Sequence, residues 1–217
     1  MRLGKASSIW SLTLKDFRVR ASSAEPTPGG GSVAIVAAVL GCTLISMALE
    51  ISVRKNKADS RLQNAMDQLR VVITKLTDYA DADIMLFKKY LAAYRAPNKS
   101  RDKLSSRHLH LTEAAKSATE ILFKAAEDIV SVIRLAPSLI DRTALNVVSD
   151  VGAGCAILDG ALRALLIGIS SNLRDLRPGT AAEFKHRRTA LQREASALSR
   201  SIRGQTEFRL KEDSQEN

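Results

Sequence analysis

Apolar residues recur along most of the chain with helical spacing. From Leu62 to Tyr94 they follow a seven-residue alternation, which is typical of a long amphipathic helix that packs one face against its neighbours. The stretch from Val33 to Leu49 is apolar on all sides, as expected of a helix that other helices surround. The pattern predicts an all-α fold, a bundle of long helices.

Glycine and proline interrupt this pattern at only a few points, which indicates one short first helix followed by several long ones. The interruptions are residues 25–31, 96–99, 136–137 and 177–179. We expect a single helical domain over residues 1–210. The polar segment 211–217 is predicted to be a flexible tail.

The uncharged stretch from Pro26 to Leu49 is long enough to span a bilayer, and basic residues follow it closely. Its glycine, serine, threonine and alanine content makes it weakly hydrophobic for a lone span, and we expect no comparable second segment. A core helix of a bundle or oligomer is therefore favoured over a membrane span, which stays open as the alternative. The prediction is a protein without a membrane partner.

The 217 residues include only 11 glycines and 5 prolines, and 45% are hydrophobic, which excludes a disordered chain. Two cysteines, Cys42 and Cys155, offer neither a disulfide framework nor a zinc quartet, and we expect buried thiols. The first residues lack a continuous apolar region followed by a small-residue cleavage pattern, and we expect no secretory signal. Together these observations predict a reducing compartment, the cytoplasm.

The net charge of +10 is compatible with nucleic acid, anionic lipid or a polyanionic small molecule. Few aromatic residues lie among the basic ones, whereas binding of single strands usually relies on aromatic stacking. We expect no nucleic-acid partner, and a solvated basic surface explains most of these side chains.

One position on the apolar stripe is a carboxylate. Asp83 stands between Ala80 and Phe87, one helical turn before the latter. Burial raises the pKa of a carboxyl group unless a cation or hydrogen-bond donors offset it, and a raised pKa suits proton transfer near neutral pH. Asp83 is the first catalytic candidate; a solvated Asp83 at a helix end is the alternative.

A second acid, Asp150, follows Ser149 in a segment of small and apolar residues. It is either a buried group that needs polar partners or the cap of a helix that begins after it. A third element, the loop Pro26–Ser32, contains Gly29, Gly30 and Gly31 and leads into the uncharged helix. Its free N–H groups and the positive end of the helix dipole are suited to an anion or a carbonyl.

These elements, in this order, resemble the cyclodeaminase/cyclohydrolase family of folate enzymes over nearly the whole chain. The resemblance rests on the glycine loop at 26–32, a basic cluster at 54–57, Asp-x-x-x-Phe and Ala-Tyr-x-x-Pro between 83 and 97, and Asn-Val-x-Ser-Asp-x-Gly at 146–152. It implies a dimeric helical bundle, a one-carbon tetrahydrofolate as substrate and no permanently bound cofactor or metal.

The resemblance also implies roles for particular residues. Asp83 and Asp150 would be catalytic, and the remaining matched positions would bind the substrate: Gly29, Gly30, Gly31, Ser32, Lys55, Lys57, Phe87, Ser149 and Asn172. The implied reaction is hydrolysis of 5,10-methenyltetrahydrofolate to 10-formyltetrahydrofolate. Two alternatives stay open, a formiminotetrahydrofolate cyclodeaminase and a folate-binding protein that has lost catalysis.

Two departures from the family pattern motivate the last alternative. Gly168 stands where the family usually has an asparagine, and Leu86 replaces a small residue beside Asp83. A polar contact to the substrate is missing at Gly168 unless Ser170 or Ser171 supplies it.

Overall fold

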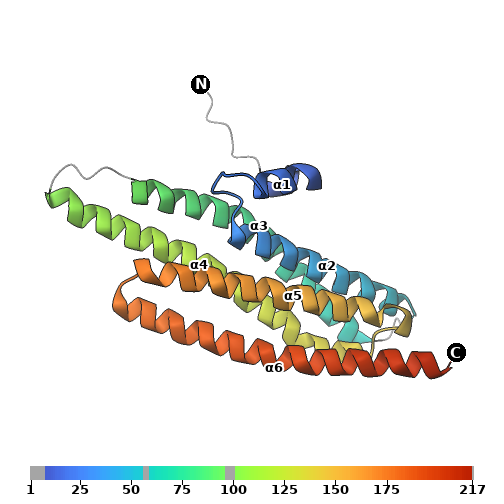
Figure 1. The fold of residues 1–217 in the computed structure, drawn as a ribbon. Coiled ribbons are helices and arrows are strands. Elements are labelled where there is room, and N and C mark those ends of the chain that lie inside the picture. The colour runs from blue at the N-terminus through green and yellow to red at the C-terminus, as the bar shows by residue number, and fades with distance from the viewer. Residues whose placement is uncertain (1–7, 56–58, 96–100, 217) are drawn as a thin grey trace.

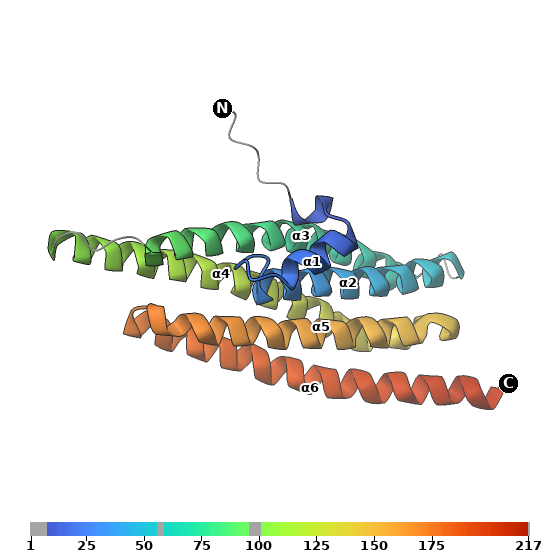
Figure 2. The same cartoon turned by 45° about the horizontal axis from the view of Figure 1, so that its top comes forward.

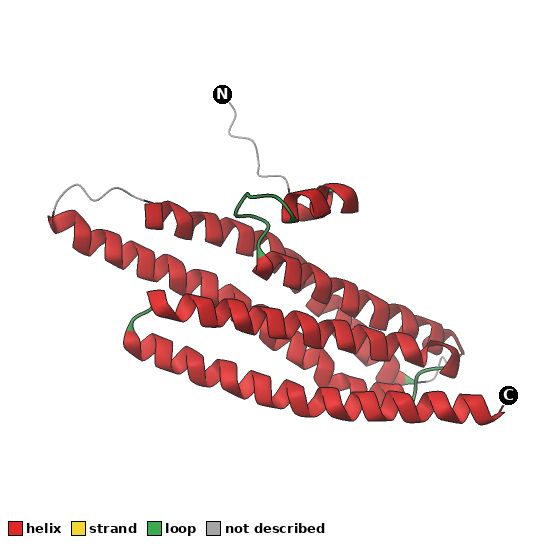
Figure 3. Ribbon diagram, in the orientation of Figure 1, coloured by secondary structure: helices red, strands yellow, loops and turns green. Residues whose placement is uncertain are grey.

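The computed structural model describes residues 8–55, 59–95 and 101–216. They form six α-helices and two short 3-10 helices, joined by short loops (Figure 3), so the all-α prediction is confirmed. In chain order these are η1 (Ile9–Ser11), α1 (Leu14–Ala21), α2 (Gly30–Lys55), α3 (Ser60–Arg95), α4 (Arg101–Ile140), α5 (Leu145–Asn172), η2 (Leu173–Asp175) and α6 (Pro178–Glu216).

The five long helices lie side by side in an elongated bundle (Figure 1), with the short α1 outside it. Helices α2, α3, α4 and α5 form a ring in which each packs on the next and α5 returns to α2. Helix α6 covers the groove between α4 and α5. Seen after a 45° turn, α2 and α5 again lie side by side, with α6 on the far side of α5 (Figure 2).

The bundle is held by a continuous apolar core. Its largest fully buried side chains include Ile35, Leu49, Leu76, Phe123 and Leu158, one or more from each helix of the ring. Replacement of such a leucine by alanine typically costs about 2–5 kcal/mol, because a cavity remains. Both cysteines are buried, and burial raises the pKa of each thiol to about 12, as expected of inert core residues.

Helices α2 and α5 make the most extensive contact in the bundle. A Cβ at Gly41 would lie 2.9 Å from the backbone oxygen of Gly154, and a Cβ at Gly154 would lie 2.8 Å from that of Gly41. Only glycine at both positions allows the two backbones to approach so closely. The small residues that weaken the hydrophobic signal of these helices are therefore the residues that let them pack.

Within the described residues, two helical segments are long and apolar enough to cross a membrane, Gly30–Lys55 and Leu145–Asp175. The expectation of no second such segment was wrong, because glycine, alanine and serine lower its apparent hydrophobicity. In the bundle, 61% of the apolar window of the first helix and 44% of that of the second are buried.

One predicted chain break is misplaced, and the break predicted at 96–99 lies outside the described residues. Pro137 lies within the last turn of α4, and the chain turns after Ile140 instead. Proline there removes one backbone donor and disfavours a longer helix, and α4 ends three residues later. Helix α6 extends to Glu216, so the backbone of most of segment 211–217 is helical.

Candidate active site

Asp83 lies on the stripe of α3 that faces the bundle. Leu69, Leu76 and Ala80 precede it on this stripe and are fully buried, which confirms the predicted alternation as far as Ala80. At its end the prediction was wrong, because Tyr94 is 56% exposed. The Asp83 side chain is half-buried and reaches the N-terminal end of α2. The solvated alternative for this residue is therefore wrong.

The carboxylate of Asp83 meets two donors of Ser32. The hydroxyl of Ser32 donates to Oδ2 of Asp83 over 2.9 Å, and the backbone N–H of Ser32 also donates to the carboxylate. A carboxylate at this place is favoured by the free N–H groups and the dipole of α2. The glycine loop was predicted to receive an anion or a carbonyl. In the structure, the carboxylate of Asp83 binds at this helix end.

Of the three loop glycines, Gly31 is the one that this contact requires. A Cβ at Gly31 would lie 2.7 and 2.8 Å from the two carboxylate oxygens of Asp83, which is closer than such atoms approach. A Cβ at Gly30 would meet nothing within 4 Å. The absence of a side chain at Gly31 is what allows Asp83 to close onto the helix end.

Burial raises the pKa of Asp83, and the hydrogen bonds from Ser32 oppose this only in part. The described residues place no cation in ion-pairing contact with it. A carboxylate in this state is a better base than a solvated one and can hold a proton closer to neutral pH. The predicted electrostatic state of Asp83 is confirmed in its direction.

A cavity of about 280 Å³ adjoins Asp83. It brings together Gly29, Gly30, Gly31, Asp83, Phe87 and Asn172, six of the predicted site residues, from α2, α3 and α5. Helix α4 adds Ala118 and Leu122, which were not predicted as site residues. Asp83 is the charged residue of this lining, which is otherwise apolar apart from glycines and the uncharged polar side chains of Thr27, Ser171 and Asn172. This cavity is therefore the candidate active site.

Phe87 is held in the cavity wall by its aromatic neighbours. Its ring stacks on that of Tyr90, with centroids 5.9 Å apart, and the hydroxyl of Tyr90 donates to Asp175 over 2.8 Å. Burial and then Asp175 raise the pKa of Tyr90, so this hydroxyl remains a donor at neutral pH. The contact fixes η2 against α3 next to the cavity.

A larger cavity of about 730 Å³ lies along the opposite side of α3, between this helix and the segment around η1. Its wall includes Asp81, which accepts hydrogen bonds from Ser8 and from the backbone N–H of Ile9. Asp81 therefore anchors the N-terminal segment. This cavity contains none of the predicted site residues, and Asp83 does not face it.

Comparison with known proteins gives the family of this chain. A sequence model of the formiminotransferase-cyclodeaminase family matches residues 13–191. The chain belongs to that family. A methenyltetrahydrofolate cyclohydrolase from Methylorubrum extorquens is 27% identical over 194 residues, which cover 88% of this chain and 93% of the relative.

A rat formimidoyltransferase-cyclodeaminase is 25% identical over 95% of this chain, which spans 39% of that relative's length. The crystal structure of a formiminotetrahydrofolate cyclodeaminase from Thermotoga maritima superposes with a TM-score of 0.82 and 18% identity. The superposition covers 92% of this chain and 98% of the other. This likeness establishes the shared fold.

The departure from the family pattern at Gly168 lies in the cavity wall. A Cβ at Gly168 would lie 3.2 Å from Leu122, so a larger side chain would require Leu122 to shift. Ser171 lines the same cavity, whereas the hydroxyl of Ser170 donates to the backbone oxygen of Leu166. Of the two serines predicted as substitutes for the asparagine, Ser171 has the suitable position. Leu86 packs against the core beside Asp83.

The other family motifs lie at the far end of the bundle. Asp150 is 22 residues before Asn172 on α5, which corresponds to about 33 Å along the helix. Lys55 is 24 residues after Gly31 on α2, or about 36 Å. One chain therefore does not bring Lys55, Ser149 or Asp150 into the cavity beside Asp83.

At that far end, the Lys55 ammonium donates to Oδ1 of Asn146 over 2.8 Å, which joins α2 to α5. Helix α5 already begins at Leu145, so Asp150 lies in its second turn and is not a helix cap. Lys57 lies outside the described residues. Asn146, Ser149 and Asp150 thus extend along one helix beside Lys55.

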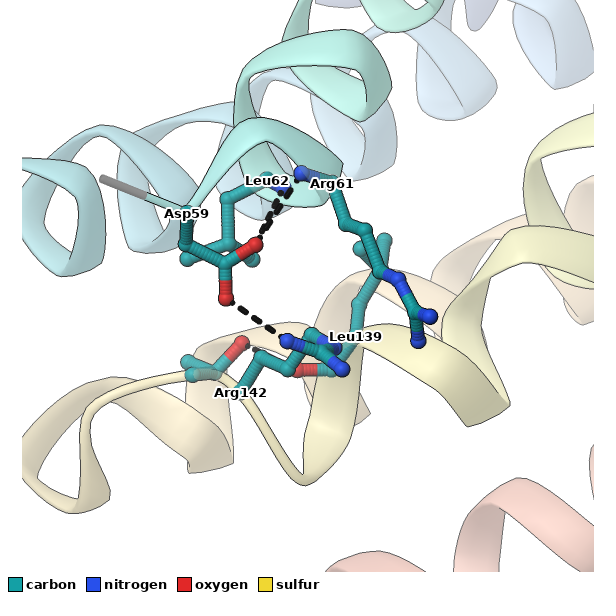
Figure 4. Close-up of polar contacts among 6 residues, drawn as sticks. Asp59, Arg61, Leu62, Leu139 and Arg142 are labelled. Carbon is teal, nitrogen blue, oxygen red and sulfur yellow. Dashed lines mark hydrogen bonds and ion pairs between the residues drawn. The ribbon is translucent and has the colours of Figure 1, made fainter. Parts of the chain in front are cut away.

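At the far end of the bundle, the carboxylate of Asp59 joins three helices. Asp59 accepts from the backbone N–H groups of Arg61 and Leu62, over 3.0 and 3.3 Å, and from Arg142 over 2.9 Å (Figure 4). These contacts join the start of α3 to the turn between α4 and α5. The hydrogen bond from Arg142 is the main cause that lowers the pKa of Asp59.

Among the described residues, no group of three His, Cys, Asp or Glu side chains is arranged to hold a metal ion.

Proposed function

We propose that the chain hydrolyses 5,10-methenyltetrahydrofolate to 10-formyltetrahydrofolate. The observation that carries this proposal is Asp83, a carboxylate with a raised pKa that faces a small cavity at the glycine loop. The relative from Methylorubrum extorquens, matched over 93% of its length, is named for this reaction. Family membership supports the folate substrate class.

The substrate is a cationic amidinium, so its one-carbon centre is already electrophilic. Water adds to that carbon, and Asp83 takes a proton from the attacking water. The resulting carbinolamine opens when its bond to one ring nitrogen breaks, and that nitrogen receives a proton from the Asp83 carboxyl. The carbinol hydroxyl loses its proton to solvent as the formyl C=O forms. Water is consumed, one proton is released, and the carboxylate is regenerated.

The cavity walls hold the substrate in position for this reaction. The backbone around Gly29–Gly31 and the side chains of Ser171 and Asn172 provide polar contacts, while Phe87 and Leu122 provide the apolar surface. The volume of about 280 Å³ suits the reacting ring system rather than a whole folate. The remainder of the substrate therefore extends through the mouth of the cavity.

A second candidate function is cyclodeamination of formiminotetrahydrofolate. In that reaction ammonia is released, and no water is added. Relatives of that name match 95% of this chain, although they extend well beyond it. A third candidate is folate binding without turnover, because Gly168 lacks the polar side chain usual at its position. Loss of methenyltetrahydrofolate absorbance, release of ammonia from formiminotetrahydrofolate, and equilibrium binding of a folate distinguish the three.

In this proposal the protein acts in the cytoplasm as a homodimer, with no permanent cofactor or metal and no nucleic-acid or membrane partner. The buried cysteines are compatible with a reducing compartment. The apolar helices α2 and α5 pack mainly on one another and on the bundle. Packing within a globular protein therefore accounts for their apolar composition.

The deciding experiment is the rate of absorbance loss of 5,10-methenyltetrahydrofolate with the purified protein, set against the uncatalysed rate. Acceleration that saturates with substrate is expected. No acceleration, together with ammonia release from formiminotetrahydrofolate, would replace the cyclohydrolase proposal with the cyclodeaminase. Folate binding without either reaction would leave the binding protein.

A further inference from the structure

The larger cavity beside α3 has the size of a small-molecule site, and the proposed reaction does not use it. Its volume of about 730 Å³ lies within the range of roughly 300–1,000 Å³ that is usual for ligand pockets. One wall is the outer face of α3, where Asp78, Ala82, Met85, Lys89 and Ala92 recur at helical spacing. The remaining wall comes from the segment between η1 and α1 and from the loop before α2.

The N-terminal segment that forms this wall is held against α3. The indole Nε1–H of Trp10 donates to the backbone oxygen of Thr77 over 2.9 Å, and the backbone N–H of Ile9 donates to Asp81 over 2.8 Å. Ile9 is buried, as is Pro28 in the loop before α2. The walls are therefore formed before a ligand arrives, which reduces the entropic cost of binding.

The middle of the cavity is apolar. Met85 is 52% exposed and lies in the wall with Leu12, Ala82 and Ile84. A methionine side chain is unbranched and polarisable, so it adapts to an aromatic or aliphatic surface placed against it. This part of the cavity is suited to the apolar body of a ligand.

Three cations line the cavity without a partner in the described part of the chain. The side chains of Arg20, Lys88 and Lys89 form no hydrogen bond or ion pair with another described residue. Other exposed cations pair with an acid on their own helix, as Arg54 does with Glu50 over 2.7 Å. An anion bound in the cavity would meet cations whose charge is not already neutralised by a contact.

The two carboxylates in the wall leave one end of the cavity cationic. Asp81 already accepts hydrogen bonds from Ser8 and from the backbone N–H of Ile9. Asp78 precedes Lys88 by ten residues, which corresponds to about 15 Å along α3. The end at Lys88 is therefore the end that favours an anion.

We propose that this cavity binds an organic anion of small-molecule size, with its anionic group at Lys88 and Lys89 and an apolar body that extends along α3. Ala82 precedes Lys89 by seven residues, or about 10 Å, which suits a body of two rings. The site is separate from the candidate active site, although Thr27 lies in the walls of both cavities. The proposal does not depend on the proposed function.

Binding is tested by fluorescence with two probes that share one aromatic body. The first, 8-anilinonaphthalene-1-sulfonate, carries an anion, and the second, N-phenyl-1-naphthylamine, does not. The anionic probe should bind the full-length protein saturably, and the double variant Lys88→Gln, Lys89→Gln should weaken this binding by about threefold to tenfold. The affinity of the neutral probe should stay the same.

A charge-matched variant separates a defined site from general attraction. Lys116→Gln, Lys124→Gln removes two exposed cations from α4, outside the cavity, and should leave the affinity for the anionic probe unchanged. Equal weakening in both double variants would overturn the proposal, because it would show attraction to the net charge alone. Equal weakening of both probes by Lys88→Gln, Lys89→Gln would overturn it as well.

The place of binding is tested by NMR of protein labelled with ¹³C at the methionine methyl groups. Met85 lines the cavity, whereas Met47 is 41% exposed on α2 and Met66 is buried. The anionic probe should shift the methyl resonance of Met85, assigned by its loss in Met85→Leu, and leave that of Met47 in place. A shift at Met47 without one at Met85 would overturn the proposal, as would the absence of saturable binding.

Discussion

Asp83 and Asp59 both accept hydrogen bonds at the N-terminal end of a helix, yet their pKa values move in opposite directions. Asp59 binds the first turn of its own helix and an arginine, and its pKa is lowered. Asp83 binds the first turn of a different helix from within a cavity, and burial raises its pKa. The same capping contact therefore makes one carboxylate structural and leaves the other able to exchange a proton.

The difference is produced by the surroundings rather than by the contact itself. Arg142 supplies a cation to Asp59, whereas the described neighbours of Asp83 are Ser32, Gly31 and uncharged cavity walls. A carboxylate without a cation in an apolar site is costly to stability and is typical of catalytic positions. The comparison predicts distinct consequences when each region is altered.

The largest effect is expected at Asp83. Asp83→Asn keeps a hydrogen-bond acceptor for Ser32 but removes the base, and a positioned general base contributes roughly 10²–10⁴-fold to rate. Turnover of methenyltetrahydrofolate should fall by that factor. Asp59→Asn, made as the matched substitution, should keep turnover near the wild-type level.

Asp83→Asn also has a predicted effect on stability. Because the pKa of Asp83 is higher in the folded state, the folded protein binds the proton more tightly than the unfolded chain. Stability then falls as pH rises from the ordinary carboxyl pKa through the raised value. Asp83→Asn removes this cost, so its melting temperature at pH 7 should equal or exceed that of the wild type. A large decrease would mean that Asp83 is chiefly a structural cap.

The next effect is expected at Gly31. Gly31→Ala places a methyl group against the carboxylate of Asp83, which must withdraw from the end of α2. Turnover should fall by about tenfold or more, since small displacements of a catalytic group are costly. Gly30→Ala is the control, because that Cβ meets nothing. Equal activity of the two variants would contradict the role of the close approach.

The smallest effect is expected at the Asp59–Arg142 pair. Arg142→Met should lower the melting temperature slightly at neutral pH, because the pair is partly exposed. The contribution is present above the unfolded pKa of Asp59 and is lost as pH falls through the lowered folded value. The difference from the wild type should therefore disappear in acid. Arg70→Met, which removes a pair on α3 that is 65% and 71% exposed, should show no difference at any pH.

The sequence predicted the helical class, the glycine loop and the acid on the apolar stripe, because each depends on local spacing. It did not predict that Ser32 would bind Asp83, since the two residues are 51 positions apart and meet only through packing. Nor did it indicate Ala118 and Leu122 of α4, whose residue types suit any core position.

The rise per residue of an α-helix gives the distance between two motifs on the same helix, which the motifs alone do not give. Gly31 and Lys55 lie on one unbroken helix, so about 36 Å must separate them in any single chain. Family motifs at both ends of that helix cannot meet in one site unless two chains contribute. Asp150 and Asn172 on α5 lead to the same conclusion.

The most direct test of the central claim is a titration of the Asp83 carboxyl by carbon NMR, assigned by comparison with Asp83→Asn, beside the pH dependence of turnover. The account predicts a pKa for Asp83 above the ordinary aspartate value and an acid limb of activity at that same pH. A pKa for Asp83 at or below the ordinary aspartate value would contradict it. So would a loss of activity in acid at a pH that differs from the measured pKa of Asp83.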